Sequence, residues 1–328
     1  MITRRKIVGA ISAGAFAPLG ALAQQPPAKL WRVGFLTPGI TSSATARVAA
    51  LRTGLRDLGY VEGTNLLIDF RAAEGKRERL AELAAELVAL KPDVIVTSAN
   101  YPSEALKRAT SSIPIVMVGS VAPVENGLIA SLARPGGNLT GLTLMSTDIA
   151  GKWLQIAREL RPGARRVGVM VQSLMQIKST LLETLQSNAQ QIKVELIVPA
   201  IKEAADIPGA FAQMRREGVQ ALIAQLNPVN FDQRREIVEA AAQLKLPAVY
   251  EGSDFVDLGG LVSYGANFID MFRQSATYID KIFNGAKPAD LPVQQPTTFE
   301  CVLNLKTAKA LGLKIPGTIL LLATRVIE

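Results

Sequence analysis

The stretch Ile113-Pro-Ile-Val-Met-Val-Gly-Ser120 decides the fold, because the chain repeats its pattern later as Leu246-Pro-Ala-Val-Tyr-Glu-Gly-Ser253. In both copies a short apolar run follows a proline and ends in Gly-Ser. A run of this kind is typical of a buried strand in a parallel sheet. The repetition predicts two lobes of similar construction, each with small polar groups at the carboxyl end of this strand.

Two further strands recur in the same order. Residues 31–37 correspond to residues 165–171, and residues 92–98 correspond to residues 219–225. Each pair lies about 130 residues apart, which is the length of one domain rather than of a solenoid repeat. Amphipathic helical segments alternate with these strands, so the sequence predicts an α/β fold of two similar, doubly wound parallel-sheet lobes.

The turn-rich segment 134–143 separates the two copies and gives a first crossing between lobes. More chain follows the second copy than that copy needs, so we expect the chain to cross back through a hinge. The expected lobe 1 comprises residues 30–143 and about 266–292, and the expected lobe 2 comprises residues 144–265 and about 293–328. A short helix is also expected over residues 123–132.

The amino terminus has the pattern of an export signal. Thr3-Arg4-Arg5 precedes an apolar run from Gly9 to Leu22, and Ala21-Leu-Ala23 forms a small-residue cleavage site. The arginine pair resembles a twin-arginine signal. We expect cleavage near Ala23 and a location in the periplasm. The alternative is a retained membrane anchor, although the apolar run is short for a transmembrane helix.

Composition excludes several classes of function. The chain has no histidine, which rules out Ser-His-Asp catalysis and histidine-bound metals. Its one cysteine, Cys301, lies in an apolar stretch, where a thiol usually packs as a small hydrophobic group. No dinucleotide-binding or Walker motif is present. We therefore expect no catalytic residues, no cofactor and no metal.

The charge distribution does not favour a nucleic-acid partner. The formal net charge is +8, and removing Arg4, Arg5 and Lys6 with the export signal leaves about +5. These charges form no long basic run, and no helix-turn-helix pattern is present. We expect a small-molecule ligand and no nucleic acid.

Several segments together resemble those of ABC-transporter substrate-binding proteins, in the family with tryptophan-binding and other amino-acid-binding members. They are residues 54–63, 131–141, 260–265, 285–296 and 304–312. The resemblance implies a type I periplasmic-binding fold that closes on a ligand and delivers it to an ABC permease and its ATPase at the inner membrane. We expect a monomer, and an amino acid or related small carboxylate as the ligand.

Ligands of open α/β sheets bind beyond the carboxyl ends of the strands. In lobe 1 the candidate residues there are Thr37, Ser98, Asn100, Tyr101 and Ser120. Ser98 and Asn100 precede a helix, whose free N–H groups favour a carboxylate. The alternative for both is ordinary capping of that helix.

In lobe 2 the candidate residues are Asn227, Tyr250, Glu251, Tyr264 and Asn267. Glu251 is the expected partner of a ligand ammonium. The tyrosines could form a stacking wall, although an aromatic side chain at a strand end is often part of the core. Gln172 and Ser173 occupy an equivalent strand end.

Two other functions remain open from the sequence. A ligand-sensing partner of a membrane receptor needs the same two lobes and differs only in its membrane partner. An enzyme on this scaffold would have to use carboxylates alone, such as Glu251 and Asp254.

Overall fold

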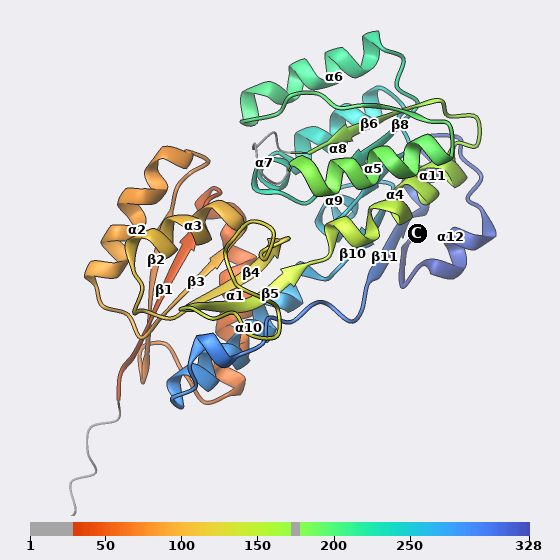
Figure 1. The fold of residues 1–328 in the computed structure, drawn as a ribbon. Coiled ribbons are helices and arrows are strands. Elements are labelled where there is room, and N and C mark those ends of the chain that lie inside the picture. Colours follow the sequence, from red (N-terminus) through yellow and green to blue (C-terminus); the bar gives the residue numbers. More distant parts are fainter. Residues whose placement is uncertain (1–28, 172–177) are drawn as a thin grey trace, which may run out of the picture.

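The structure is a computed structural model that describes residues 29–171 and 178–328. The export signal expected in residues 1–23, Gln172 and Ser173 lie outside the described residues. The chain forms two α/β lobes, each built on its own sheet (Figure 1). The predicted fold class is therefore confirmed. No helix in the described ranges is both long and apolar enough to cross a membrane.

Lobe 1 is built on a five-stranded parallel sheet with the order β2-β1-β3-β4-β5. Its strands are β1 (Trp31–Thr37), β2 (Leu66–Ala72), β3 (Val94–Ser98), β4 (Ile115–Val121) and β5 (Leu139–Leu144). Alternate residues of β1 enter different cores: Val33 and Phe35 pack in one, and Leu36 in the other. This alternation is the period-two pattern of a strand buried on both faces.

Helices cover both faces of this sheet. The core of Leu36 includes residues of α2 (Leu80–Ala89) and α3 (Asn100–Ala109). The core of Phe35 includes residues of α1 (Thr41–Asp57) and α10 (Phe268–Phe283). Helix α10 follows a strand of lobe 2 in sequence, yet it lies beside α1 in lobe 1 (Figure 1). At Gly54 this contact is so close that an added Cβ would lie 2.3 Å from the Arg273 carbonyl oxygen.

Lobe 2 is built on a seven-stranded sheet with the order β12-β11-β10-β9-β8-β6-β7. Its strands are β6 (Arg166–Met170), β7 (Glu195–Ile197), β8 (Ala221–Ala224), β9 (Ala248–Tyr250), β10 (Val262–Gly265), β11 (Glu300–Asn304) and β12 (Arg325–Ile327). Its helices are α4 (Ser146–Leu160), α5 (Lys178–Gln191), α6 (Ile207–Arg216), α7 (Pro228–Asp232), α8 (Arg234–Gln243), α9 (Ser253–Asp257), α11 (Leu305–Ala310) and α12 (Gly317–Leu322).

The chain passes between the two sheets three times: between β5 and α4, between β10 and α10, and through residues 295–299. Just before the third segment, the Gln294 N–H donates to the Gly141 carbonyl of β5 at 2.9 Å. The third segment then enters lobe 2 at the end of the sheet where β10 finishes. Strand β11 therefore runs antiparallel to β10, whereas the sequence predicted parallel pairing throughout.

The helix expected over residues 123–132 is absent, and this described segment consists of turns and bends. Ala122 and Gly127 both have positive φ angles. The Asn126 side chain donates to the carbonyls of Val121 and Ala122 at 3.1 and 2.8 Å. These side-chain bonds and left-handed residues replace helical hydrogen bonds.

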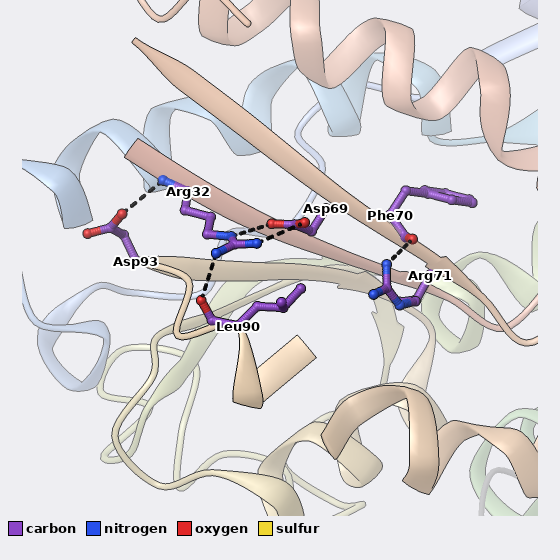
Figure 2. A network of polar contacts seen from close by, with 6 residues as sticks. All are labelled: Arg32, Asp69, Phe70, Arg71, Leu90 and Asp93. Carbon is purple, nitrogen blue, oxygen red and sulfur yellow. Dashed lines mark hydrogen bonds and ion pairs between the residues drawn. The ribbon is translucent and has the colours of Figure 1, made fainter. Parts of the chain in front are cut away.

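A polar network joins the strands of lobe 1 at the end opposite the cleft (Figure 2). The Arg32 guanidinium donates to both Asp69 oxygens, at 2.5 and 3.2 Å, and to the Leu90 carbonyl at 3.1 Å. The Arg32 N–H donates to Asp93 at 2.8 Å. Arg71, towards the carboxyl end of β2, donates separately to the carbonyl of its neighbour Phe70 at 3.0 Å. The hydrogen bond to Asp69 raises the pKa of Arg32. This network joins β1 to β2 and to the segment before β3.

Candidate functional site

The first turns of α1 in lobe 1 meet α7 of lobe 2 where the strand ends of the two lobes face each other. The Asp232 carboxylate accepts a hydrogen bond from the Ile40 N–H at 3.1 Å. Arg234 donates to the Ser43 hydroxyl at 3.4 Å. The sequence positions α7 through Asn227, whose side chain accepts from the Asn230 N–H at 2.9 Å, and through a proline in the first turn. The lobes thus touch directly across the cleft.

Arg47 of α1 lies buried at this junction and is only 5% exposed. Its guanidinium carbon lies 3.9 Å from the centre of the Phe231 ring in lobe 2. It also lies 4.8 Å from the Phe268 ring and 5.9 Å from the Phe272 ring. The Arg47 Nε has no hydrogen-bond partner among the described residues. Burial lowers the pKa of Arg47 to about 10, and the charges of Asp254 and Asp232 oppose that shift.

Two partly buried carboxylates of lobe 2 face this arginine. Burial raises the pKa of Asp232, whereas hydrogen bonds from Ser43 and Ile40 oppose the rise. Burial also raises the pKa of Asp254, in the first turn of α9, and the charges of Arg47 and Arg234 oppose that rise. Two acids and two bases therefore form one electrostatic group. In the described ranges, no three carboxylate or thiol groups come together as a metal would require.

A cavity of about 370 Å³ opens between the lobes beside this charged group. A volume of this size suits a small molecule. Lobe 1 supplies Pro38, Ile40, Glu74, Gly75, Lys76, Arg77 and Tyr101. Lobe 2 supplies Lys202, Glu203, Ala204, Ala205, Pro228, Val229, Asp232 and Gln233. A larger cavity of about 660 Å³ is lined by α4, α5 and Pro316, all from lobe 2. The cavity of about 370 Å³ is lined by both lobes, so their closure can enclose it.

The predicted residues of lobe 1 lie at the strand ends but have different surroundings. Thr37, Ser98 and Ser120 are buried, and the Ser120 hydroxyl has no partner among the described residues. Tyr101 lines the cavity between the lobes, with its ring 5.3 Å from the Arg77 guanidinium. Of the predicted lobe 1 residues, Tyr101 is therefore the one placed at that cavity.

The Asn100 amide is used within lobe 1. Its Nδ2 donates to the Val121 carbonyl at 2.7 Å, and its Oδ1 accepts from the Val121 N–H at 2.9 Å. The residue before it, Ala99, has a φ angle of 67°. These bonds hold the start of α3 against the end of β4, so they support a structural role for Asn100. Its contact with a ligand stays a prediction.

Glu251 is 2% exposed and has partners within lobe 2. One oxygen accepts from the Ser146 hydroxyl, and the other accepts from the Leu226 N–H at 2.8 Å. Burial raises the pKa of Glu251 to about 7, and these two bonds oppose the rise. Because Ser146 begins α4, just after the first crossing, Glu251 joins the end of β9 to the hinge. An ammonium-binding role for Glu251 stays a prediction.

The other predicted residues of lobe 2 also have partners within the protein. Tyr250 is buried and stacks on Phe255, with 4.8 Å between ring centres. The Tyr264 carbonyl accepts from the Trp153 indole at 2.7 Å. Asn267 caps α10 and also donates to Glu300 at 3.2 Å. Asn267 belongs to the second crossing, and Glu300 begins β11 directly after the third, so this contact lies beside the hinge.

Arg47 and Asp232 were missed from the sequence, although one signal for Arg47 was present. Val48, Leu51 and Leu55 form the buried stripe of α1, and Arg47 lies one turn before Leu51 on that stripe. An arginine at a core position of an amphipathic helix indicates a buried charge that needs a partner. Asp232 gave no comparable signal, because its contact depends on the arrangement of two lobes.

Comparisons with known proteins identify the family of this chain. The sequence model of the family described as "ABC transporter substrate binding protein" matches residues 40–327. A curated relative, the "Tyrosine-binding protein" of Clostridioides difficile, is 25% identical over 261 residues, which cover 79% of this chain and 74% of the relative.

Two solved structures extend the likeness over about nine-tenths of the chain. A conserved domain protein from Vibrio cholerae is 28% identical with a TM-score of 0.85, covering 91% of this chain and all of that one. The "ABC domain in complex with L-Trp" from Streptococcus pneumonia is 26% identical with a TM-score of 0.81, covering 90% of this chain and all of that one. This chain belongs to the ABC transporter substrate-binding protein family.

Proposed function

We propose that the protein captures an amino acid or related small carboxylate between its two lobes in the periplasm, and delivers it to an ABC importer. The charged junction around Arg47 carries this proposal, because it holds groups of both signs at a place where the two lobes meet. A ligand carrying a carboxylate and an ammonium matches such a set. The relatives named for tyrosine and for bound L-Trp support the same ligand class.

Capture works through a hinge movement. The contacts of Asp232 with Ile40 and of Arg234 with Ser43 join residues of different lobes, so they form only when the lobes are together. A ligand that touches both lobes adds further contacts to that state and shifts the population towards it. The permease then reads the closed form. The pattern of an export signal in residues 1–23 supports the periplasmic location.

Ligand capture is tested by a thermal-shift screen of protein that begins at Gln24 and has been unfolded and refolded to remove any bound ligand. The panel contains the twenty amino acids, small carboxylates, purines and sugars. A rise in Tm of several degrees with amino acids is expected, since a ligand at 100 times its Kd stabilises by about 2.7 kcal/mol. A rise with sugars or purines alone would contradict the ligand class.

Delivery needs a separate test. The permease and ATPase encoded nearest to the gene are reconstituted in lipid nanodiscs. The liganded protein is expected to stimulate ATP hydrolysis more than the unliganded protein does. Equal rates with both forms, from a complex that hydrolyses ATP, would contradict a role in import and favour a sensing role.

A further inference from the structure

Positive charge is concentrated where four neighbouring strands of lobe 2 begin. The strands β9, β8, β6 and β7 lie side by side in this order and are parallel. Because parallel strands begin at the same edge of a sheet, the segments that lead into them are neighbours. Seven exposed basic residues, which we call the basic edge, occupy these segments: Arg161, Arg165, Arg166, Lys193, Arg215, Arg216 and Lys245.

Hydrogen bonds hold these segments next to one another. The Glu195 N–H donates to the Arg165 carbonyl at 2.8 Å, and the Gln220 N–H donates to the Arg166 carbonyl at 3.0 Å. Neighbouring strands lie about 4.8 Å apart, so the four strand starts span about 15 Å. They lie at the end of lobe 2 that is turned away from lobe 1 (Figure 1). The basic edge can therefore be occupied while the cleft binds its ligand.

Few acids balance the basic edge. The same segments contain Glu195, which lies 2.9 Å from the Arg166 guanidinium, and Glu217. The other six basic side chains form no ion pair with any described residue. Seven bases and two acids leave an excess of five positive charges. The chain from Gln24 onwards has a net charge of about +5, so the rest of it is close to neutral.

Compensation of helix dipoles does not account for this excess. Helices α4, α5, α6 and α8 end at the basic edge, and the negative end of a helix dipole favours cations in the last turn. Helices α1, α2 and α3 end at the matching edge of lobe 1. There, however, Lys29 pairs with Asp93, and Arg32 pairs with Asp69. Similar dipoles thus accompany paired charges in lobe 1 and unpaired positive charges in lobe 2.

The composition of the basic edge indicates what kind of anion it fits. Its segments contain no aromatic residue on which a nucleic-acid base could stack. None of the large hydrophobic side chains exposed on the described chain lies in them, so nothing there would insert into a bilayer. Its cations begin at one sheet edge and are spread over about 15 Å. Such a set matches the many headgroups of an anionic lipid surface.

We propose that the basic edge binds the anionic lipid surface of the membrane that holds the permease. Each Lys or Arg close to such a surface strengthens binding about fivefold. Binding through the end of lobe 2 leaves the cleft free and raises the concentration of the protein near its transporter. The location at this membrane rests on the proposed function, whereas the lipid contact itself needs no bound solute.

Co-sedimentation with vesicles tests the lipid contact, using protein that begins at Gln24. Vesicles of phosphatidylcholine with about one-third phosphatidylglycerol are compared with pure phosphatidylcholine. At about 0.15 M salt the protein should bind the anionic vesicles at least about tenfold more strongly. It should be released at about 1 M salt, where charges are screened beyond about 3 Å. Equal binding to both kinds of vesicle, or binding to neither, would overturn the proposal.

A double variant locates the contact on the protein. Arg165→Gln with Arg216→Gln removes two charges from the basic edge and should weaken vesicle binding about 25-fold. Neither side chain has a hydrogen bond or an ion pair among the described residues, so the fold should be kept. The control is Arg56→Gln with Arg134→Gln, which removes two exposed, unpaired arginines from lobe 1. It should bind vesicles as the wild type does. Equal losses in both double variants would overturn the proposal.

Two further measurements separate this proposal from its alternatives. Tighter binding to a DNA duplex than to the anionic vesicles, at equal phosphate concentration, would assign the basic edge to nucleic acid and overturn the lipid contact. Calorimetry of the wild type with amino acids separates the contact from solute capture. If an amino acid binds but anionic vesicles do not, the lipid contact fails and the proposed function stands. If vesicles bind but no solute does, the proposed function fails and the lipid contact stands.

Discussion

The Asp232 carboxylate of lobe 2 caps the first helix of lobe 1, accepting a hydrogen bond from the Ile40 N–H at 3.1 Å. The N-cap residue of α1, Ile40, has no side chain that can cap the helix, and the next N–H, that of Thr41, donates to Glu74 of lobe 1 at 3.2 Å. A helix start leaves free N–H groups that need acceptors. The Ile40 N–H finds its acceptor, Asp232, in the other lobe. This cap therefore exists only while the lobes are together.

Asp232→Ala therefore acts on closure rather than on folding. Loss of a helix cap costs about 1 kcal/mol, which corresponds to about a fivefold weaker ligand affinity. The Tm of the unliganded protein should change little. Calorimetric titration with the ligand identified by the screen checks the first effect, and a thermal scan checks the second.

Asn304 supplies the control for this variant, because its side chain caps α11 within lobe 2 by accepting from the Thr307 N–H at 3.1 Å, and it does not line the cavity between the lobes. Asn304→Ala should lower the Tm and leave ligand affinity unchanged. If Asp232→Ala behaves in the same way, the cap across the cleft plays no part in closure.

Glu251→Gln should change how stability depends on pH. The folded pKa of Glu251 is raised to about 7 from an ordinary value of 4.5, so the folded state binds more protons between these pH values. Stability from this group therefore falls as pH rises from 4.5 to 7 and stays low above 7. The variant should lose that part of the slope in urea unfolding measured from pH 4.5 to 8.

The alternative role of Glu251, as a ligand contact, predicts a different behaviour of the same variant. If its carboxylate binds a ligand ammonium, as expected from the sequence, Glu251→Gln weakens ligand binding and leaves the unliganded Tm unchanged. Its bonds to Ser146 and Leu226 favour the effect on stability. An unchanged pH slope would contradict that structural role.

Asn100→Ala should destabilise lobe 1. The substitution removes both hydrogen bonds to Val121 and leaves its buried backbone N–H without this acceptor, whereas the Val121 carbonyl keeps its bond from Asn126. An unpaired buried group costs about 1–3 kcal/mol. Urea unfolding should show a loss in this range even without ligand. A normal unfolding free energy together with weaker ligand binding would instead support ligand contact by the amide.

Gly54→Ala tests the packing of α10 on α1. The new methyl would lie 2.3 Å from the Arg273 carbonyl oxygen and 2.8 Å from the Ala276 Cβ. Overpacking of this kind costs about 1–3 kcal/mol. Gly209→Ala in α6 is the control, since nothing lies within 4 Å of its added methyl, and it should leave stability equal or up to about 1 kcal/mol higher. Equal stability of both variants would contradict the close approach.

Most of the fold could be predicted because its signals are local. The repeated runs after Pro114 and Pro247 became β4 and β9, and the alternating helices followed their apolar periodicity. The antiparallel β11 was not predictable, because its direction depends on where the returning chain enters the sheet of lobe 2. A short helix was expected over residues 123–132, but two left-handed residues and the Asn126 side chain produced turns.

The candidate site was predicted in its position better than in its residues. Strand ends located the cleft, but a polar residue there can face either the cleft or a neighbouring backbone. Asn100 and Glu251 face groups of their own lobes. Arg47 and Asp232 come from a helix face and a short turn of helix, and each meets a residue of the other lobe. Such contacts depend on how the lobes meet, which no local pattern records.

The most direct test of capture between the lobes is the distance between them, measured by double electron–electron resonance. Spin labels are placed at Glu82→Cys in α2 and Arg216→Cys in α6, two exposed positions in different lobes (Figure 1). The native Cys301 is 1% exposed and should stay unlabelled. The amino acid identified by the screen should shorten and narrow the distance distribution, and its amide should not. A distribution unchanged by a saturating amino acid would contradict closure of the lobes on the ligand.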